Sequence, residues 1–128
     1  REGFVFHFLE SGQERTGEDG MAVAAEVLDR LFATVQARKG ADPETSYTAK
    51  LFSRGTSKIA QKVGEEAVEA ILEAVRGDKT ALASESADLL YHLMVLWADA
   101  GLEPAEVWEK LAQREGTSGI AEKKARKA

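Results

Sequence analysis

The 128-residue sequence contains no cysteine, only two prolines and no long hydrophobic run. Without cysteine the chain has no disulfide and no thiolate metal site, which fits a reducing compartment such as the cytoplasm. No apolar run approaches the roughly 20 residues that a membrane-spanning helix needs, so we expect no membrane partner. Positive charge is not in excess either. The formal net charge is −5, which is not the profile of a general nucleic-acid binder.

Several catalytic motifs are also absent. No glycine-rich loop follows a strand pattern, which argues against P-loop and dinucleotide-binding sites. The sequence has no HExxH zinc motif, and two histidines leave little scope for serine–histidine catalysis. Alanine, glutamate, leucine and lysine, which favour helices, are instead frequent. The length is enough for one domain with a modest core.

Residues 1–20 differ from the rest of the chain. They hold five acids against two arginines, and their apolar run, Phe4 to Leu9, is too short for a secretory signal. We expect an N-terminal extension that is non-native or disordered, with Met21 as the natural start and residues 21–128 as the domain. The alternative is a native arm that packs through its phenylalanines.

Apolar periodicity predicts an all-α domain, a bundle of four to five helices. The expected helices cover about residues 22–38, 46–54, 56–75, 81–100 and 104–114, followed by a basic tail. Tyr47, Leu51 and Phe52 would anchor the short second helix. Thr56 and Asp78 are predicted N-caps of the two long helices. The short Gly77–Asp78 connection between these helices favours an antiparallel hairpin.

Polar side chains at spacings of three and four form two lines beside the apolar faces of this hairpin. The lines are Glu66, Glu69 and Glu73 on the first helix, and Glu85, Asp88 and His92 on the second. Packing of the two helices would bring these carboxylates together at the rim of the core. Two like charges about 4 Å apart repel by about 4 kcal/mol at an effective dielectric near 20. A hard divalent cation such as Mg²⁺, which also binds substrate phosphates, would offset that repulsion. The alternative is a solvated acidic face, with His92 a core or rim histidine.

Four cations lie just before the acids in the sequence: Lys50, Arg54, Lys58 and Lys62. One interpretation is a phosphate-binding flank, in which cations hold the phosphates of a substrate while the acids hold the metal. The other is an ordinary solvated face.

The motifs together resemble the phosphoribosyl-ATP pyrophosphatases of histidine biosynthesis. The resemblance covers about residues 22–126 and rests on KVGEEAVE, ADLLYH and REGTSG, of which REGTSG separates this family from its generic relatives. Those relatives are the MazG-like all-α nucleoside-triphosphate pyrophosphohydrolases, whose signature is ExxE followed by ExxD. Here the pairs are Glu66 with Glu69 and Glu85 with Asp88, with 15 residues between the pairs.

The resemblance implies Mg²⁺-dependent hydrolysis of N1-(5-phosphoribosyl)-ATP to N1-(5-phosphoribosyl)-AMP and pyrophosphate by a cytoplasmic enzyme. It implies that Glu66, Glu69, Glu85 and Asp88 ligate the metal and that Glu65 orients or deprotonates water. The candidates for phosphate contacts are Lys50, Arg54, Lys58, Lys62, Arg114 and Ser118. We also expect His92 to steady Asp88 one turn away.

The resemblance also implies at least a dimer. The thin core and the aromatic rings of Trp97 and Trp108 suggest the same, because a second copy could cover those rings. Two alternatives remain open. One is a house-cleaning pyrophosphohydrolase that acts on simple triphosphates such as dUTP. The other is a non-catalytic helical interaction module, whose stability would not depend on Mg²⁺.

Overall fold

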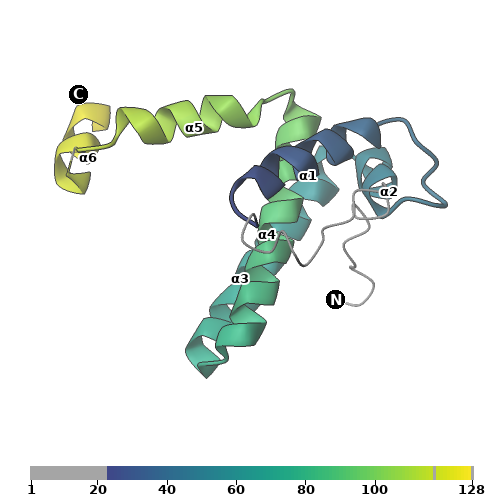
Figure 1. Cartoon of the computed structure of the whole chain (residues 1–128), viewed down its shortest axis with the longest axis horizontal. Helices are drawn as coiled ribbons and strands as arrows, with labels where there is room; N and C mark the ends of the chain where they lie inside the picture. The colour runs from purple at the N-terminus through teal and green to yellow at the C-terminus, as the bar shows by residue number, and fades with distance from the viewer. Residues whose placement is uncertain (1–22, 117, 128) are drawn as a thin grey trace.

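The computed structural model describes residues 23–116 and 118–127, and all regular secondary structure within them is helical (Figure 1). The helices are α1 (Glu26–Ala37), α2 (Tyr47–Arg54), α3 (Thr56–Arg76), α4 (Lys79–Ala100), α5 (Pro104–Gln113) and α6 (Gly119–Lys127). The predicted all-α class is therefore confirmed. The expected extension at residues 1–20 lies outside the described part of the chain. No described helix is long and apolar enough to cross a membrane.

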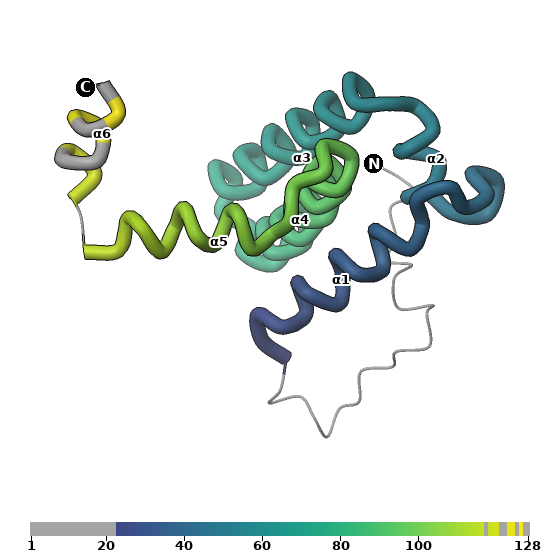
Figure 2. Tube along the Cα trace, turned by 90° about the horizontal axis from the view of Figure 1, so that it is seen from above, coloured from purple at the N-terminus to yellow at the C-terminus, as the bar shows by residue number. Residues whose placement is uncertain are grey.

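The centre of the fold is the predicted antiparallel hairpin of α3 and α4 (Figures 1 and 2). Gly77 adopts a left-handed conformation with φ of 81°, which lets the chain leave α3 without a steric penalty. Asp78 caps α4 as predicted, since its Oδ1 accepts a hydrogen bond of 2.9 Å from the Ala81 amide. The N-cap predicted at Thr56 is wrong. Gly55 holds that position, and the Thr56 hydroxyl donates instead to Asp99 Oδ2 at 2.6 Å across the hairpin.

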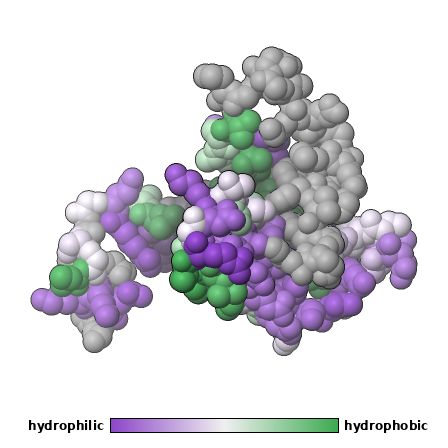
Figure 3. All heavy atoms as spheres, turned by 90° about the horizontal axis from the view of Figure 1, so that it is seen from below, coloured by the Kyte–Doolittle hydropathy of each residue, from purple (hydrophilic) through white to green (hydrophobic). Residues whose placement is uncertain are grey.

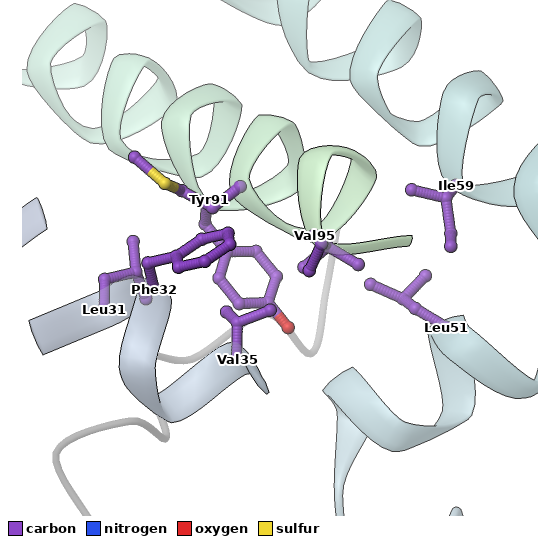
Figure 4. Close-up of a cluster of buried hydrophobic side chains, with 9 residues drawn as sticks. Leu31, Phe32, Val35, Leu51, Ile59, Tyr91 and Val95 are labelled. Carbon is purple, nitrogen blue, oxygen red and sulfur yellow. The ribbon is translucent and has the colours of Figure 1, made fainter. Parts of the chain in front are cut away.

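The hydrophobic core lies at one end of this hairpin, where α1 and α2 pack against it (Figure 1). Figure 4 shows buried side chains from all four helices pointing toward one another. They are Leu31, Phe32, Val35, Leu51, Ile59, Tyr91, Met94, Val95 and Ala98. Helix α1 begins at Glu26, about one turn later than the predicted residue 22. These four helices form the bundle.

The other end of the hairpin is not covered in the same way. Val68, Ile71, Leu72 and Val75 of α3 are exposed by 53, 59, 48 and 83%. With Ile71 59% exposed, this face of α3 does not pack on α4, and the core formed with α1 and α2 lies at the other end of the hairpin.

Helices α5 and α6 extend away from the bundle as an arm (Figure 1). An edge-to-face contact between Trp97 and Trp108, with ring centroids 5.9 Å apart, joins α5 to the end of α4. Pro104 occupies the first turn of α5, as expected for a residue without an amide hydrogen. The basic tail forms α6.

Candidate active site

Three of the predicted acids meet inside the α3–α4 hairpin. Glu66 comes from α3, and Glu85 and Asp88 come from α4. One carboxylate oxygen from each residue lies within 4.8 Å of the others. Their side chains are almost fully buried, with Glu66 only 2% exposed. The i, i+3 spacing puts Glu85 and Asp88 on one face of α4, and the hairpin turns that face toward Glu66.

The donor chemistry of this cluster fits a hard divalent cation. All three groups offer carboxylate oxygens, the ligands that Mg²⁺ and Ca²⁺ prefer. Opposite oxygens around Mg²⁺ are roughly 4.2 Å apart, given Mg–O distances of about 2.1 Å. Adjacent oxygens around the same ion are about 3.0 Å apart, so the three carboxylate oxygens, which lie within 4.8 Å of one another, would draw closer together to share one ion. Such an ion would also offset the repulsion between the buried charges.

Glu69 does not belong to this group of three. It lies one turn after Glu66 on α3 and is half-buried. Glu73, another turn along, pairs with Arg76 at 3.1 Å. Of the acids on α3, Glu66 is therefore the one that meets Glu85 and Asp88 of α4.

Glu65 is not one of the three converging acids, and its side chain is exposed. Its carboxylate accepts hydrogen bonds from Gln61 Nε2 at 2.7 Å and from Lys62 Nζ at 3.0 Å. These two bonds, from Gln61 and then Lys62, lower the pKa of Glu65. Glu65 is therefore a carboxylate at neutral pH, and a comparatively weak base.

The candidate phosphate-binding residues fall into three groups. Lys50 and Arg54 are exposed on α2, while Lys58 and Lys62 are half-buried on α3 beside the acids. Arg114 and Ser118 are exposed on the α5–α6 arm, which leads away from the hairpin that carries the carboxylates (Figure 1). Within one chain, the four cations thus lie on α2 and α3, close to the hairpin. Arg114 and Ser118 lie on the arm, apart from the carboxylates.

His92 lies one turn after Asp88 and is 1% exposed. Its Nδ1 is 2.8 Å from the Asp88 backbone oxygen, so the histidine contacts the main chain of Asp88. Its Nε2 is 3.2 Å from the Tyr47 hydroxyl of α2. Burial lowers the pKa of His92, although the bond to Asp88 opposes this shift. The sequence indicates Tyr47 only as an apolar anchor. Its hydrogen-bond partner His92 is 45 residues away in the sequence, so local spacing gives no signal for this contact.

Tyr47 also lies among the candidate site charges. Burial raises the pKa of its phenol, and the charges of Lys62 and Glu66 act on it with opposite signs. Its ring stacks on Tyr91, with centroids 6.2 Å apart, and the Tyr91 hydroxyl in turn hydrogen-bonds Thr48. The first turn of α2 is thereby fastened to α4 next to the acid cluster.

The fold and the site define an all-α protein whose central hairpin carries a buried carboxylate cluster able to hold a metal ion. This arrangement is the one expected of the all-α pyrophosphohydrolases. The sequence profile of the family described as phosphoribosyl-ATP pyrophosphohydrolase matches residues 28–115. The chain belongs to this family and is accordingly an enzyme of the hydrolase class.

Curated relatives agree with the profile. A phosphoribosyl-ATP pyrophosphatase of Azospirillum brasilense is 87% identical over 106 residues, which is 83% of this chain and 96% of that protein. The protein of the same name from Paramagnetospirillum magneticum is 59% identical over 106 residues, covering 83% of this chain and 97% of the relative. One from Cereibacter sphaeroides is 65% identical over 100 residues, or 78% of this chain and 97% of the relative.

Proposed function

We propose that this enzyme hydrolyses N1-(5-phosphoribosyl)-ATP to N1-(5-phosphoribosyl)-AMP and pyrophosphate with the help of Mg²⁺, as a step of histidine biosynthesis. The observation that carries the proposal is the buried cluster of Glu66, Glu85 and Asp88 in a chain so similar to proteins named for this activity. A cytoplasmic location is part of the same proposal, because a substrate with several phosphate charges does not cross membranes unaided.

The reaction adds water across the α–β phosphoanhydride, and the α–β P–O bond breaks as a new P–O bond to the water oxygen forms. A divalent cation, when bound, would neutralise charge on the leaving pyrophosphate. Glu66, Glu85 and Asp88 would hold that ion, because their oxygens already converge. Glu69 would join them by turning its half-buried side chain toward the cluster.

Glu65 suits the role of orienting the attacking water better than that of removing its proton. The hydrogen bonds from Gln61 and Lys62 lower the pKa of Glu65 and so weaken it as a base. Lys62 is also one of the four cations proposed to bind phosphate. A phosphate oxygen that takes Lys62 away from Glu65 would leave the carboxylate oriented only by Gln61 and open to water.

The same proposal includes a homodimer. The exposed residues Val68, Ile71, Leu72 and Val75 follow the i, i+3, i+4, i+7 pattern of one apolar helix face. Figure 3 shows hydrophobic surface at the centre of the view and again on the arm, which carries exposed Leu111 and Ile120. A second copy would cover this α3 face. The proposed dimer includes an approach of Arg114 and Ser118 of one subunit to the acids of the other, since within one chain both residues lie on the arm that leads away from the hairpin.

The decisive experiment measures pyrophosphate release from phosphoribosyl-ATP with Mg²⁺ and with EDTA, alongside ATP and dUTP. We expect release from phosphoribosyl-ATP alone, lost in EDTA. Efficient release from ATP or dUTP would instead identify a house-cleaning enzyme. A folded protein that releases pyrophosphate from none of the three would refute the proposal and favour a non-catalytic helical module.

A further inference from the structure

A short chain of hydrogen bonds connects α2 to the turn of α4 that carries Asp88. It starts at the Tyr47 hydroxyl, passes through the buried ring of His92 and ends at the Asp88 backbone oxygen. A carbonyl oxygen only accepts hydrogen bonds, so Nδ1 of His92 carries the hydrogen of the second bond. In the neutral ring, Nε2 is then an acceptor, and the Tyr47 hydroxyl donates to it.

The ring of His92 is held on several sides. It makes edge-to-face contacts with Tyr91 at 4.9 Å and with Tyr47 at 6.0 Å between ring centroids. A ring so enclosed transmits the position of one partner to the other, since it has little room to turn without losing both hydrogen bonds. Displacement of Tyr47 would therefore loosen the Asp88 turn.

The face of α2 that bears Tyr47 also bears two candidate phosphate ligands. Lys50 and Arg54 follow Tyr47 at i+3 and i+7, which places all three on one side of the helix. Helix α2 has only eight residues, and Leu51 in the core together with the contacts of its first turn sets its orientation. The hydrogen bond of Tyr47 therefore contributes to the direction in which these cations project.

We infer that Tyr47 is a positioning residue whose hydrogen bond to His92 aligns the cation-bearing face of α2 with the carboxylates that hold the metal. This role rests on the proposed function, because it requires that the acid cluster bind a divalent cation. Tyr47 would touch neither the ion nor the reacting atoms. Outer residues that orient metal ligands typically change metal affinity 10- to 100-fold when removed.

The test compares Tyr47→Phe with Tyr91→Phe. Each variant keeps its aromatic ring and loses one hydroxyl that ties α2 to α4. The Tyr47 hydroxyl bonds to His92 Nε2, and the Tyr91 hydroxyl bonds to Thr48. Binding of Mn²⁺, followed by electron paramagnetic resonance, reports metal affinity without requiring turnover. Circular dichroism and thermal unfolding verify that each variant is folded.

We expect Tyr47→Phe to weaken Mn²⁺ binding about tenfold and to raise KM for phosphoribosyl-ATP more than it lowers kcat. Tyr91→Phe should keep the Mn²⁺ affinity of the unaltered protein, although its unfolding temperature falls. His92→Asn should match Tyr47→Phe, because the asparagine amide can donate to the Asp88 oxygen yet is too short to reach Tyr47. The double variant should then bind Mn²⁺ no more weakly than either single variant.

Equal Mn²⁺ affinity in the unaltered protein and in Tyr47→Phe would overturn the positioning role and leave the proposed function standing. Equal weakening by Tyr47→Phe and Tyr91→Phe would also overturn it, since the effect would then come from general loosening of α2. An unaltered, folded protein that binds no Mn²⁺ would instead refute the metal site of the proposed function.

Discussion

Replacing Glu66 by glutamine should stabilise the metal-free protein and remove its response to Mg²⁺. The substitution keeps the size and shape of the side chain and removes one of three charges from a buried cluster. Most substitutions of buried residues destabilise a protein. A gain in stability here would therefore be specific evidence for carboxylates that are held together for function at a cost to the fold.

The structure sets the scale of the effect. No two of the three carboxylate oxygens are more than 4.8 Å apart, so each ionised pair repels by at least about 3 kcal/mol at an effective dielectric near 20. Removing Glu66 removes two such pairs. Side-chain movement and counter-ions relieve much of this in the metal-free protein, and we expect about 2 kcal/mol in the free energy of unfolding. For a domain of roughly 100 residues, that raises Tm by about 10 °C.

The assay is thermal unfolding in EDTA and in a series of Mg²⁺ concentrations. An ion that binds only the folded state adds about 2.7 kcal/mol when present at 100 times its Kd. We expect this shift in the unaltered protein and little or none in Glu66→Gln. Glu73→Gln is the matched control, since Glu73 lies two turns along the same helix and pairs with Arg76 outside the cluster. It should lower Tm slightly and keep the Mg²⁺ shift.

Two results would refute this reasoning. If Glu66→Gln unfolded at a lower temperature than the unaltered protein in EDTA, repulsion within the cluster would be weaker than the favourable contacts of the Glu66 carboxylate. If Mg²⁺ shifted Glu66→Gln and the unaltered protein equally, the ion would bind elsewhere.

Three further predictions concern catalysis, assembly and pH. Asp88→Asn should lower pyrophosphate release by more than about 100-fold, because even outer-shell changes cost up to that much; unchanged turnover with an intact helical spectrum would remove Asp88 from the site. Ile71→Glu should shift sedimentation from dimer to monomer, whereas Val23→Glu, at a similarly exposed valine, should not; a dimer that persists in Ile71→Glu would exclude this face. Burial raises the pKa of Tyr91, so above pH of about 10 the folded state retains a proton that the unfolded state loses, and stability falls as pH rises. Urea unfolding at pH 8 and 10.5 should show a smaller loss for Tyr91→Phe than for the unaltered protein, and an equal loss would contradict the assignment.

Much of the secondary structure follows from the sequence. Apolar periodicity located the two long helices, and Asp78 marked the start of α4 because its carboxylate can satisfy a free amide there. These features depend on contacts within a few residues, which is why a single sequence reveals them. The prediction of Thr56 as an N-cap is wrong because the Thr56 hydroxyl donates to the carboxylate of Asp99, which is 43 residues away.

The sequence predicted the acidic lines of the candidate site but not which acids converge. Helical spacing put Glu66 and Glu69 on one side of α3, and Glu85 with Asp88 on one side of α4. Which acids converge depends on the rotation and stagger of the two helices, and side chains far apart in the chain set both. The tertiary structure brought Glu66 to the two acids of α4 and left Glu69 outside the group of three.

The sequence by itself thus determined the helices, the hairpin and the two acidic lines, because each arises from neighbours along the chain. Only the tertiary structure decided the contact between Tyr47 and His92 and the exposure of Ile71. The physical reason is the same for both. A helix face is a local property, but what covers that face is decided by where α1 and α2 pack, and they pack at one end of the hairpin only.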